Sequence, residues 1–284
     1  MTVQGPEAVE RAPSLARNVQ KISEGRRVLA GRILIFIVVL ALWEGISGPL
    51  VDPFWLSRPS LIAVYLYDWV VHGDFFKHFW FTIFATLAGF VLGTVVGLAT
   101  GLPLGRAERL ARILDPFLVA LNGIPRAALA PLFVVWFGIG LLPKVILVFT
   151  LVYFVVFYNA YSGVRYVERR YLDLAWAMGA SGTQLFRKVI FPAALPYILL
   201  GIKLSIPYAL IGAIIGEFVA SSAGLGYKLQ LETSLYNTTG TMGGIIVLMA
   251  IVVVMNAVLA WVERRALAWR PARRGSAGDG GTGI

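Results

Sequence analysis

The sequence predicts an all-α integral membrane protein with about six transmembrane helices. Of its 284 residues, 58% are hydrophobic and only 14% are charged, whereas soluble proteins carry about 25% charged residues. Apolar stretches long enough to cross a bilayer as a helix also recur along the chain. We place these spans at residues 33–50, 79–102, 113–137, 144–163, 197–219 and 242–262.

The basic residues gather in alternate connections between the spans. They precede the first span, separate the second from the third and the fourth from the fifth, and follow the sixth: Arg11, Arg17, Lys21, Arg26, Arg27, Arg32; Arg106, Arg109, Arg112; Arg165, Arg169, Arg170, Arg187, Lys188; Arg264, Arg265, Arg270, Arg273, Arg274. This is the positive-inside pattern, which predicts a multi-pass protein of the plasma (inner) membrane with both termini in the cytoplasm. It also explains the net charge of +10 without a nucleic-acid partner.

The residue types exclude several kinds of site. The chain contains no cysteine, so disulfides, thiolate nucleophiles and cysteine-based metal sites are absent. His72 and His78 lie in the first external loop, where we expect interfacial packing and no metal. No lysine follows a glycine, so a P-loop is absent, and there is no H-E-x-x-H or nucleophile elbow. We therefore expect neither a catalytic residue nor a cofactor bound by this chain.

The first part of the chain holds a tail, the first span and an external loop. Residues 1–31 are polar and predict a disordered cytoplasmic tail. Residues 32–75 hold the first span, interrupted by Glu44 and Gly48, and an external segment rich in aromatic side chains. Such a segment suits a short helix in the outer headgroup region, although a folded cap without lipid contact fits equally well.

Residues 76–264 form the predicted transmembrane core, and residues 265–284 a basic, glycine-rich cytoplasmic tail. The second span carries glycines at a strict interval of four: Gly89, Gly93, Gly97 and Gly101. Because four residues are just over one helical turn, these glycines line one stripe where another backbone can approach closely. Gly212 and Gly216 repeat the interval in the fifth span. The stripes therefore predict tight helix packing.

The third span is predicted to break near its middle. Pro125 stands there with Asn122 and Arg126 on either side. Proline removes a backbone donor, and a membrane-buried arginine needs a partner or an aqueous cavity. We therefore expect this break to line an internal space. A purely bracing role for Arg126 through backbone carbonyls fits the same residues.

Residues 165–192 predict a cytoplasmic hairpin of two short helices. In the first, about 167–178, the stripe of Leu172, Ala175, Trp176 and Gly179 lies along one face. Gly179 provides the turn, and Ser181 with Gln184 forms an S-x-x-Q capping box for the second helix. Phe186 belongs to the apolar face of that second helix, which we expect Pro192 and Pro196 to end.

This hairpin resembles the EAA loop of ABC-importer permeases, whose pattern is E-A-A, three residues, Gly, nine residues, then I-x-L-P. Asp173, Ala175 and Gly179 occupy those positions, followed at the right spacing by Val189-Ile190-Phe191-Pro192. The chain departs from the pattern in Asp for Glu, Leu for the first Ala, Val for Ile and Phe for Leu. Residues 121–140 and 216–227 resemble the nitrate/sulfonate/taurine branch of these permeases.

The resemblance implies a type I importer permease and its partners. The hairpin, with Asp173, Ala175, Gly179, Ser181, Phe186 and Pro192, is then the element that couples to a separate ABC ATPase. Two ATPase copies would hold the ATP and magnesium, and a second permease copy or a paralogue would complete a central pathway. An extracytoplasmic solute-binding protein would deliver a small solute, which for this branch is nitrate, a sulfonate, taurine or bicarbonate. Related members carry pyrimidine precursors or riboflavin.

Within such an importer we expect the polar residues of the third and fifth spans to line or gate the pathway: Asn122, Arg126, Glu217, Ser221 and Ser222. Polar groups at that depth cost free energy unless they meet water, one another or substrate, and Arg126 favours an anionic substrate. A structural ion pair between Arg126 and Glu217 is a competing interpretation. A rival of another class is an ion-coupled secondary transporter that uses Glu44, Arg126 and Glu217.

Overall fold

The computed structural model describes residues 27–266, in which the regular elements are helices and one isolated bridge joins Ser47 to Val51. The helices are an N-terminal helix Arg27–Ile46, then α2 Pro59–Val71, α3 Phe75–Arg106, α4 Glu108–Asn122, the 3-10 helix η1 Arg126–Leu129, α5 Ala130–Phe137, α6 Leu142–Arg165, α7 Arg169–Ala177, α8 Gly182–Leu185, the π-helix η2 Phe186–Ile190, α9 Phe191–Val219, α10 Leu225–Ser234 and α11 Thr238–Ala266. The predicted all-α class is confirmed.

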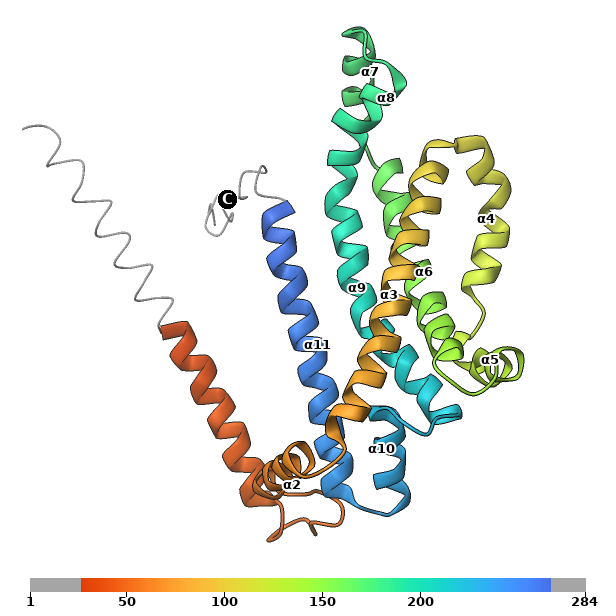
Figure 1. The fold of residues 1–284 in the computed structure, drawn as a ribbon. Helices are drawn as coiled ribbons and strands as arrows, with labels where there is room; N and C mark the ends of the chain where they lie inside the picture. The colour runs from red at the N-terminus through yellow and green to blue at the C-terminus, as the bar shows by residue number, and fades with distance from the viewer. Residues whose placement is uncertain (1–26, 267–284) are drawn as a thin grey trace, which may run out of the picture.

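Five or six crossings follow from the length and composition of these elements. Five helices are long and apolar enough to span a membrane, and α4 with η1 and α5, which bend by 71°, makes a sixth when the pair is counted as one broken span. In Figure 1 the α7–α8 hairpin projects from one end of the bundle, while α2 and α10 lie at the opposite end. The end of α3 and the last described turn of α11 point toward the hairpin end, as the predicted topology requires.

Helix α6 is the centre of the fold, because α3 and α9 pack against it on two sides. Gly89, Gly93, Gly97 and Gly101 face α6 so closely that an added Cβ at Gly89 would lie 2.4 Å from the Cβ of Val148. On the other side, a Cβ at Gly212 would lie 3.1 Å from the Cα of Val148. The two glycine stripes thus allow the close backbone approach that their spacing indicates.

The N-terminal helix begins and ends earlier than the predicted first span. Glu44 does not interrupt it; the helix continues to Ile46, and Gly48 follows with φ +102°. The Glu44 carboxylate accepts hydrogen bonds from Ser60 N (3.0 Å) and Ser60 Oγ (2.7 Å), so it holds the first turn of α2. An acidic group is favourable at a helix N-terminus. Glu44 therefore anchors the two helices to each other at the end of the bundle opposite the hairpin, which we call the outer end.

The expected terminal tails lie largely outside the described residues. The part of segment 1–31 that is described, residues 27–31, is helical and belongs to the N-terminal helix. Of segment 265–284 only residues 265 and 266 are described, as the end of α11.

Helix α2 forms part of the outer layer of the fold. Trp69 on α2 is buried and packs with Leu210 and Ile214 of α9, Leu225 of α10 and Ile251 of α11. Tyr67 on the same helix is 63% exposed. One face of α2 therefore covers the outer core, and the other is free for the headgroup region that the aromatic composition predicts.

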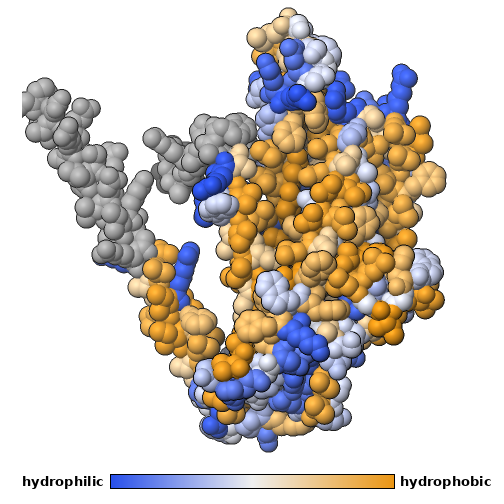
Figure 2. Space-filling view, in the orientation of Figure 1, coloured by the Kyte–Doolittle hydropathy of each residue, from blue (hydrophilic) through white to orange (hydrophobic). Residues whose placement is uncertain are grey.

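A broad apolar surface surrounds the middle of the bundle. Figure 2 shows hydrophobic residues between a polar hairpin end and a mixed outer end. Exposed apolar side chains occur on α3, α4, α9 and α11 alike, and a soluble monomer rarely shows apolar patches of this extent. This surface fits contact with the lipid bilayer.

Candidate functional site

The hairpin begins with α7 and turns at Gly179. Gly179 has φ +77°, a conformation that side-chain-bearing residues rarely adopt, and nothing lies within 4 Å of the place a Cβ would take. The requirement for glycine therefore comes from the backbone angle and not from crowding. Beyond the turn, Ser181 Oγ accepts from Gln184 N at 3.4 Å, and Gln184 Oε1 accepts from Ser181 N at 2.9 Å. The capping box is present as predicted.

The inner face of the hairpin packs on the bundle. Leu185 and Ile190 are buried against Ala160 and Val164 of α6, together with Ala194 and Ile198 of α9. Leu172 and Ala175 of α7 and Phe186 pack partly against the same cluster. The apolar stripe expected along α7 is thus divided between two environments. Leu172 and Ala175 pack against the bundle of this same chain.

The outer face of the hairpin is exposed and apolar. Leu174 is 59% exposed, Trp176 55% and Met178 79%. Asp173 lies among them, exposed and without a hydrogen bond to any described residue. Of the predicted coupling residues, Asp173, Gly179 and Ser181 are exposed, Ala175 and Phe186 pack against the bundle, and Pro192 is partly buried. Unpaired aromatic and methionine side chains of this kind are typical of protein contact surfaces.

The second hairpin helix does not end at the prolines. Helix α8 continues through the π-helix η2 into α9, so residues Gly182–Val219 form one apolar helical stretch of 38 residues. In the π-turn the N–H of Phe191 bonds to the carbonyl of Phe186, five residues back. Pro192 follows this turn directly and has no N–H to bond to the preceding turn, and the π-turn shifts the bonding pattern just before it. The expectation that Pro192 and Pro196 end this helix is therefore wrong.

Arg106 fastens the hairpin to the end of α3. Its guanidinium donates to the carbonyl of Gly182 at 3.4 Å and lies 5.1 Å from the centre of the Phe186 ring. A cation above an aromatic face is attracted by the ring quadrupole. Displacement of the hairpin therefore acts on α3 as well as on α9.

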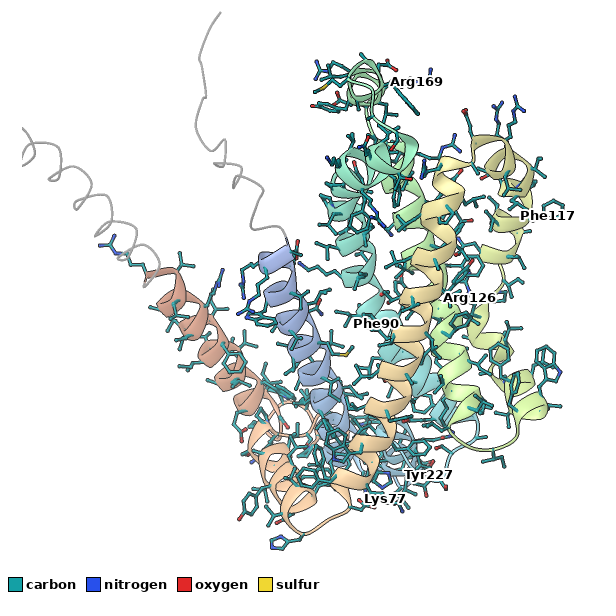
Figure 3. The ribbon with its side chains drawn as sticks, turned by 45° about the horizontal axis from the view of Figure 1, so that its top comes forward. Lys77, Phe90, Phe117, Arg126, Arg169 and Tyr227 are labelled. Carbon is teal, nitrogen blue, oxygen red and sulfur yellow. The ribbon has the colours of Figure 1, made fainter. Side chains whose placement is uncertain are left out.

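The break in the third span occurs where the sequence predicts it. Arg126 Nη2 donates to the carbonyl of Asn122 at 3.2 Å and to its side-chain Oδ1 at 2.9 Å, so the two residues hold the bend between α4 and η1. The guanidinium also lies 4.2 Å from the centre of the Phe154 ring on α6. Asn122 is exposed and Arg126 partly so. In the view of Figure 3, Arg126 lies between Arg169 of the hairpin and Lys77 at the opposite end, on the side nearer to Lys77.

Glu217 lies apart from the break and forms a separate cluster. Its side chain is completely buried, and its carboxylate accepts from Thr82 Oγ1 on α3 at 2.7 Å and from Gly226 N at 2.6 Å. Among the described residues Arg126 forms no ion pair with Glu217, so the structural bridge between them is not formed. A buried, fully bonded carboxylate is an anchor for the segment after α9, whatever further role it has.

Thr82 and His78 extend this anchor along one face of α3. Thr82 Oγ1 also accepts from Leu225 N at 2.7 Å, and His78 Nδ1 accepts from Gly224 N at 3.0 Å. His78 Nε2 contacts Asp74 Oδ2 at 2.8 Å. Burial alone would raise the pKa of Asp74, but hydrogen bonds from His78 and Trp69 outweigh it, and the pKa lies below its usual value.

Lys144 on α6 also bonds to the segment that follows α9. It is 1% exposed, and its ammonium donates to the carbonyls of Gly140 (2.6 Å) and Ala220 (2.9 Å). These bonds join the loop after α5 to the end of α9. From the sequence alone, Lys144 is only the first residue of the predicted fourth span, and Thr82 has no role. The signal that could have found Thr82 is the interval of four residues between His78, Thr82 and Thr86, which puts three polar side chains on one face of an apolar helix.

The two serines of the predicted pathway differ. Ser221 Oγ bonds to the carbonyl of Ala223 and accepts from its N–H, which shapes the local turn, whereas Ser222 is exposed. Gly224 follows with φ +121°. Between residues 27 and 266 no group of three or more His, Cys, Asp or Glu side chains could hold a metal ion.

A second buried carboxylate joins α2, α10 and the segment just before α11. Glu232 accepts from Tyr65 at 2.8 Å and from Asn237 at 2.7 Å, and Lys228 lies 3.0 Å away. Burial raises the pKa of Glu232, but these three partners outweigh it and hold the pKa below its ordinary value of 4.5.

Comparisons with known proteins bear on the family and the fold of the chain. Residues 89–267 match the family described as binding-protein-dependent transport system inner membrane component. The chain is 32% identical to a permease protein of Bacillus subtilis named for aliphatic sulfonate transport, over 86% of this chain and 88% of that one. It is also 32% identical to the formylaminopyrimidine transport permease protein of Halalkalibacterium halodurans, over 84% of this chain and 94% of that one. A solved MetNI methionine ABC transporter chain in an inward-facing conformation is similar with a TM-score of 0.58 and 21% identity, over 66% of this chain and 93% of that one.

Proposed function

The chain belongs to the binding-protein-dependent transport system inner membrane components, the permease subunits of ABC importers, and we propose that it carries a small organic or inorganic anion of the sulfonate type. As a permease it is a multi-pass inner membrane protein and not an enzyme, and it works with an ATPase and a binding protein. We infer further that ATP and magnesium bind only to the ATPase, that two ATPase copies serve two permease copies or a permease and a paralogue, and that both termini are cytoplasmic.

The observation that carries the coupling role is the exposed face of the hairpin. Leu174, Trp176 and Met178 project where the bundle ends and have no partner among the described residues. A folded, capped hairpin that keeps such side chains in solvent is best explained by a protein that covers them. In this family the covering protein is the ATPase, and Asp173 at the centre of the same face would contribute a polar contact.

The observation that carries the substrate class is Arg126 at the break of the third span. Only two of its contacts, both to Asn122, are hydrogen bonds, so most of its five donors remain available. A partly exposed guanidinium between two halves of a broken helix can donate paired hydrogen bonds to two oxygens of a sulfonate or carboxylate. The name of the Bacillus subtilis relative supports this class. Asn122 and Ser222, both exposed, accompany Arg126 in the proposed pathway.

One observation favours a second substrate class. Arg126 lies over Phe154, and an aromatic ladder of Phe149, Tyr153, Phe157 and Tyr161 stacks along α6 nearby. A flat heteroaromatic molecule would suit such surroundings, and the Halalkalibacterium halodurans relative is named for a formylaminopyrimidine. We rank this class second because keeping a charged guanidinium in a membrane span costs more free energy than keeping an aromatic ring there. The arginine therefore needs a functional reason more than the aromatic residues do.

The test is uptake by the transporter reconstituted with its ATPase and binding protein. We expect ATP-dependent uptake of an alkanesulfonate, and competition by other sulfonates but not by a formylaminopyrimidine. Arg126→Gln should lower uptake at least about tenfold, the loss of one charge-assisted contact. Lys203→Gln is the control, because Lys203 is also a cation within a span but pairs with Glu263 at 3.9 Å. Competition by the pyrimidine alone would overturn the anionic assignment.

A further inference from the structure

A pocket of about 370 Å³ lies at the base of the hairpin, between the ends of α3 and α6 and the hairpin helices. Its floor is apolar, formed by Val164, Leu172, Leu185 and Ile190. Three arginines line it from three elements: Arg106 from α3, Arg165 from α6 and Arg169 from α7. The proposed function uses none of this space.

Most of the donors on these arginines are uncommitted. Arg106 donates to Gly182 and Arg165 donates to Tyr161 at 2.6 Å, while Arg169 makes no hydrogen bond or ion pair with any described residue. A guanidinium has five N–H donors in a fixed fork. The pocket therefore offers several unused donors to a single occupant.

The single carboxylate in the lining does not neutralise the arginines. Glu108 is exposed, and the guanidinium nearest to it is that of Arg112, which lies 3.6 Å away and outside the pocket. The lining keeps a net positive charge. The positive-inside rule explains why basic residues are numerous at this end of the bundle. It does not explain why three arginines surround one pocket with an apolar floor.

We propose that this pocket binds a tetrahedral oxyanion, a phosphate or sulfonate group, whose apolar attachment lies against the floor. The pocket lies at the hairpin end, which the proposed orientation puts at the cytoplasmic leaflet, where anionic lipid headgroups are concentrated and basic pockets between helices bind them. A free amphiphilic anion in the cytoplasm offers the same chemistry. The occupant bridges α3, α6 and α7 and stiffens the hairpin that contacts the ATPase.

The experiment uses the whole transporter, reconstituted in nanodiscs of phosphatidylcholine alone or with added phosphatidylglycerol, and its thermal stability and ATPase rate are measured. A parallel arm titrates sodium sulfate into the phosphatidylcholine discs at constant ionic strength. The test variant is Arg165→Gln/Arg169→Gln, which spares Arg106 and its hold on the hairpin. The matched control is Arg109→Gln, which removes an exposed charge from the same end of the bundle without touching the pocket.

We expect phosphatidylglycerol to raise the stability of the wild type and of Arg109→Gln, with the apparent affinity at least about tenfold weaker in the double variant. That result identifies a lipid headgroup. A saturable sulfate effect that the double variant loses identifies a free anion. If both effects are equal in the double variant and the control, the pocket binds no anion. If the double variant loses only its ATPase subunit, with unchanged responses to lipid and sulfate, the arginines are protein contacts and the proposal is overturned.

Discussion

Thr82 of α3 and Glu217 of α9, 135 residues apart in the sequence, meet at 2.7 Å in the buried outer end of the bundle. Thr82 serves two partners at once, since its hydroxyl donates to the carboxylate and accepts from Leu225 N. Glu217 in turn holds Gly226 N. These bonds fix the segment between α9 and α10, which no regular helix bonds support.

Replacing Thr82 by valine should therefore destabilise the protein far more than its volume suggests. The change removes a donor from Glu217 and leaves Leu225 N without a partner, at a cost of about 2–4 kcal/mol. Thr94→Val is the matched control on the same helix, because the Thr94 hydroxyl is buried and has no hydrogen-bond partner. It should change stability by less than about 1 kcal/mol. Thermal unfolding of the detergent-solubilised chain measures both, and equal effects would mean that Thr82 is ordinary packing.

Gly179→Val should uncouple the transporter without preventing membrane insertion. A β-branched residue at φ +77° costs on the order of 1–2 kcal/mol, and the hairpin can relieve it only by changing its turn. We expect loss of ATPase association and of uptake. Gly182→Ala is the control, because Gly182 lacks a positive φ and its nearest neighbour, Arg106 Nη2, is 3.9 Å from an added Cβ. Normal co-purification of the ATPase with the valine variant would remove the hairpin from the coupling mechanism.

Single cysteines can separate the two predicted pathway regions, because the chain has none of its own. Cysteine at 122 or 222 should react with a water-soluble thiol reagent in the assembled transporter, since Asn122 and Ser222 are exposed. Cysteine at 217 should be protected, because Glu217 is completely buried. Labelling at 217 as fast as at 222 would show that this residue faces the pathway after all.

Glu232 predicts a stability difference that depends on pH. Its pKa is lower in the folded protein than the ordinary 4.5, so the ionised form stabilises the fold above that pH, and this contribution is lost as the pH falls through the folded-state value. Glu232→Gln should therefore be less stable than the wild type at neutral pH, with the difference shrinking below pH 4.5. Thermal unfolding of both proteins along a pH series tests this, and a constant difference would exclude the carboxylate as its source.

The orientation can be tested with reporter fusions. Fusions after Arg112 and Arg170 should report the cytoplasm, and fusions at Gly73 and Lys228 should report the outside. The basic residues at the ends of α3, α6 and α11 motivate this. One reversed signal would require a different number of crossings.

Much of the fold could be predicted because its causes are local. The six apolar stretches, the break around Pro125 and the turn at Gly179 each follow from a few adjacent residues, and the glycine interval already marks the face of α3 that meets α6. The outer cluster could not be predicted in this way. Thr82 and Lys144 find their partners only after α3, α6 and α9 have packed, and no spacing in the sequence connects them.

The continuity between the hairpin and α9 was missed for a different reason. Prolines at 192 and 196 normally predict a helix end, but the π-turn Phe186–Ile190 shifts the bonding pattern before Pro192. The sequence pattern also could not predict which hairpin residues are covered and which are open. Leu172 and Trp176 belong to the same apolar stripe, yet Leu172 packs against the bundle and Trp176 is exposed.

The unbroken stretch Gly182–Val219 has a mechanical consequence. Thirty-eight helical residues extend roughly 57 Å, nearly twice the ~30 Å hydrocarbon core. One end of this stretch joins, through the turn at Gly179, the α7 segment that carries the exposed surface, and the other end carries the Glu217 anchor. A tilt of about 5° around its midpoint would move each end by roughly 2.5 Å in opposite directions. A stroke delivered at the hairpin thus reaches the far side of the membrane as a reversed displacement, without any signal having to pass from one side chain to the next.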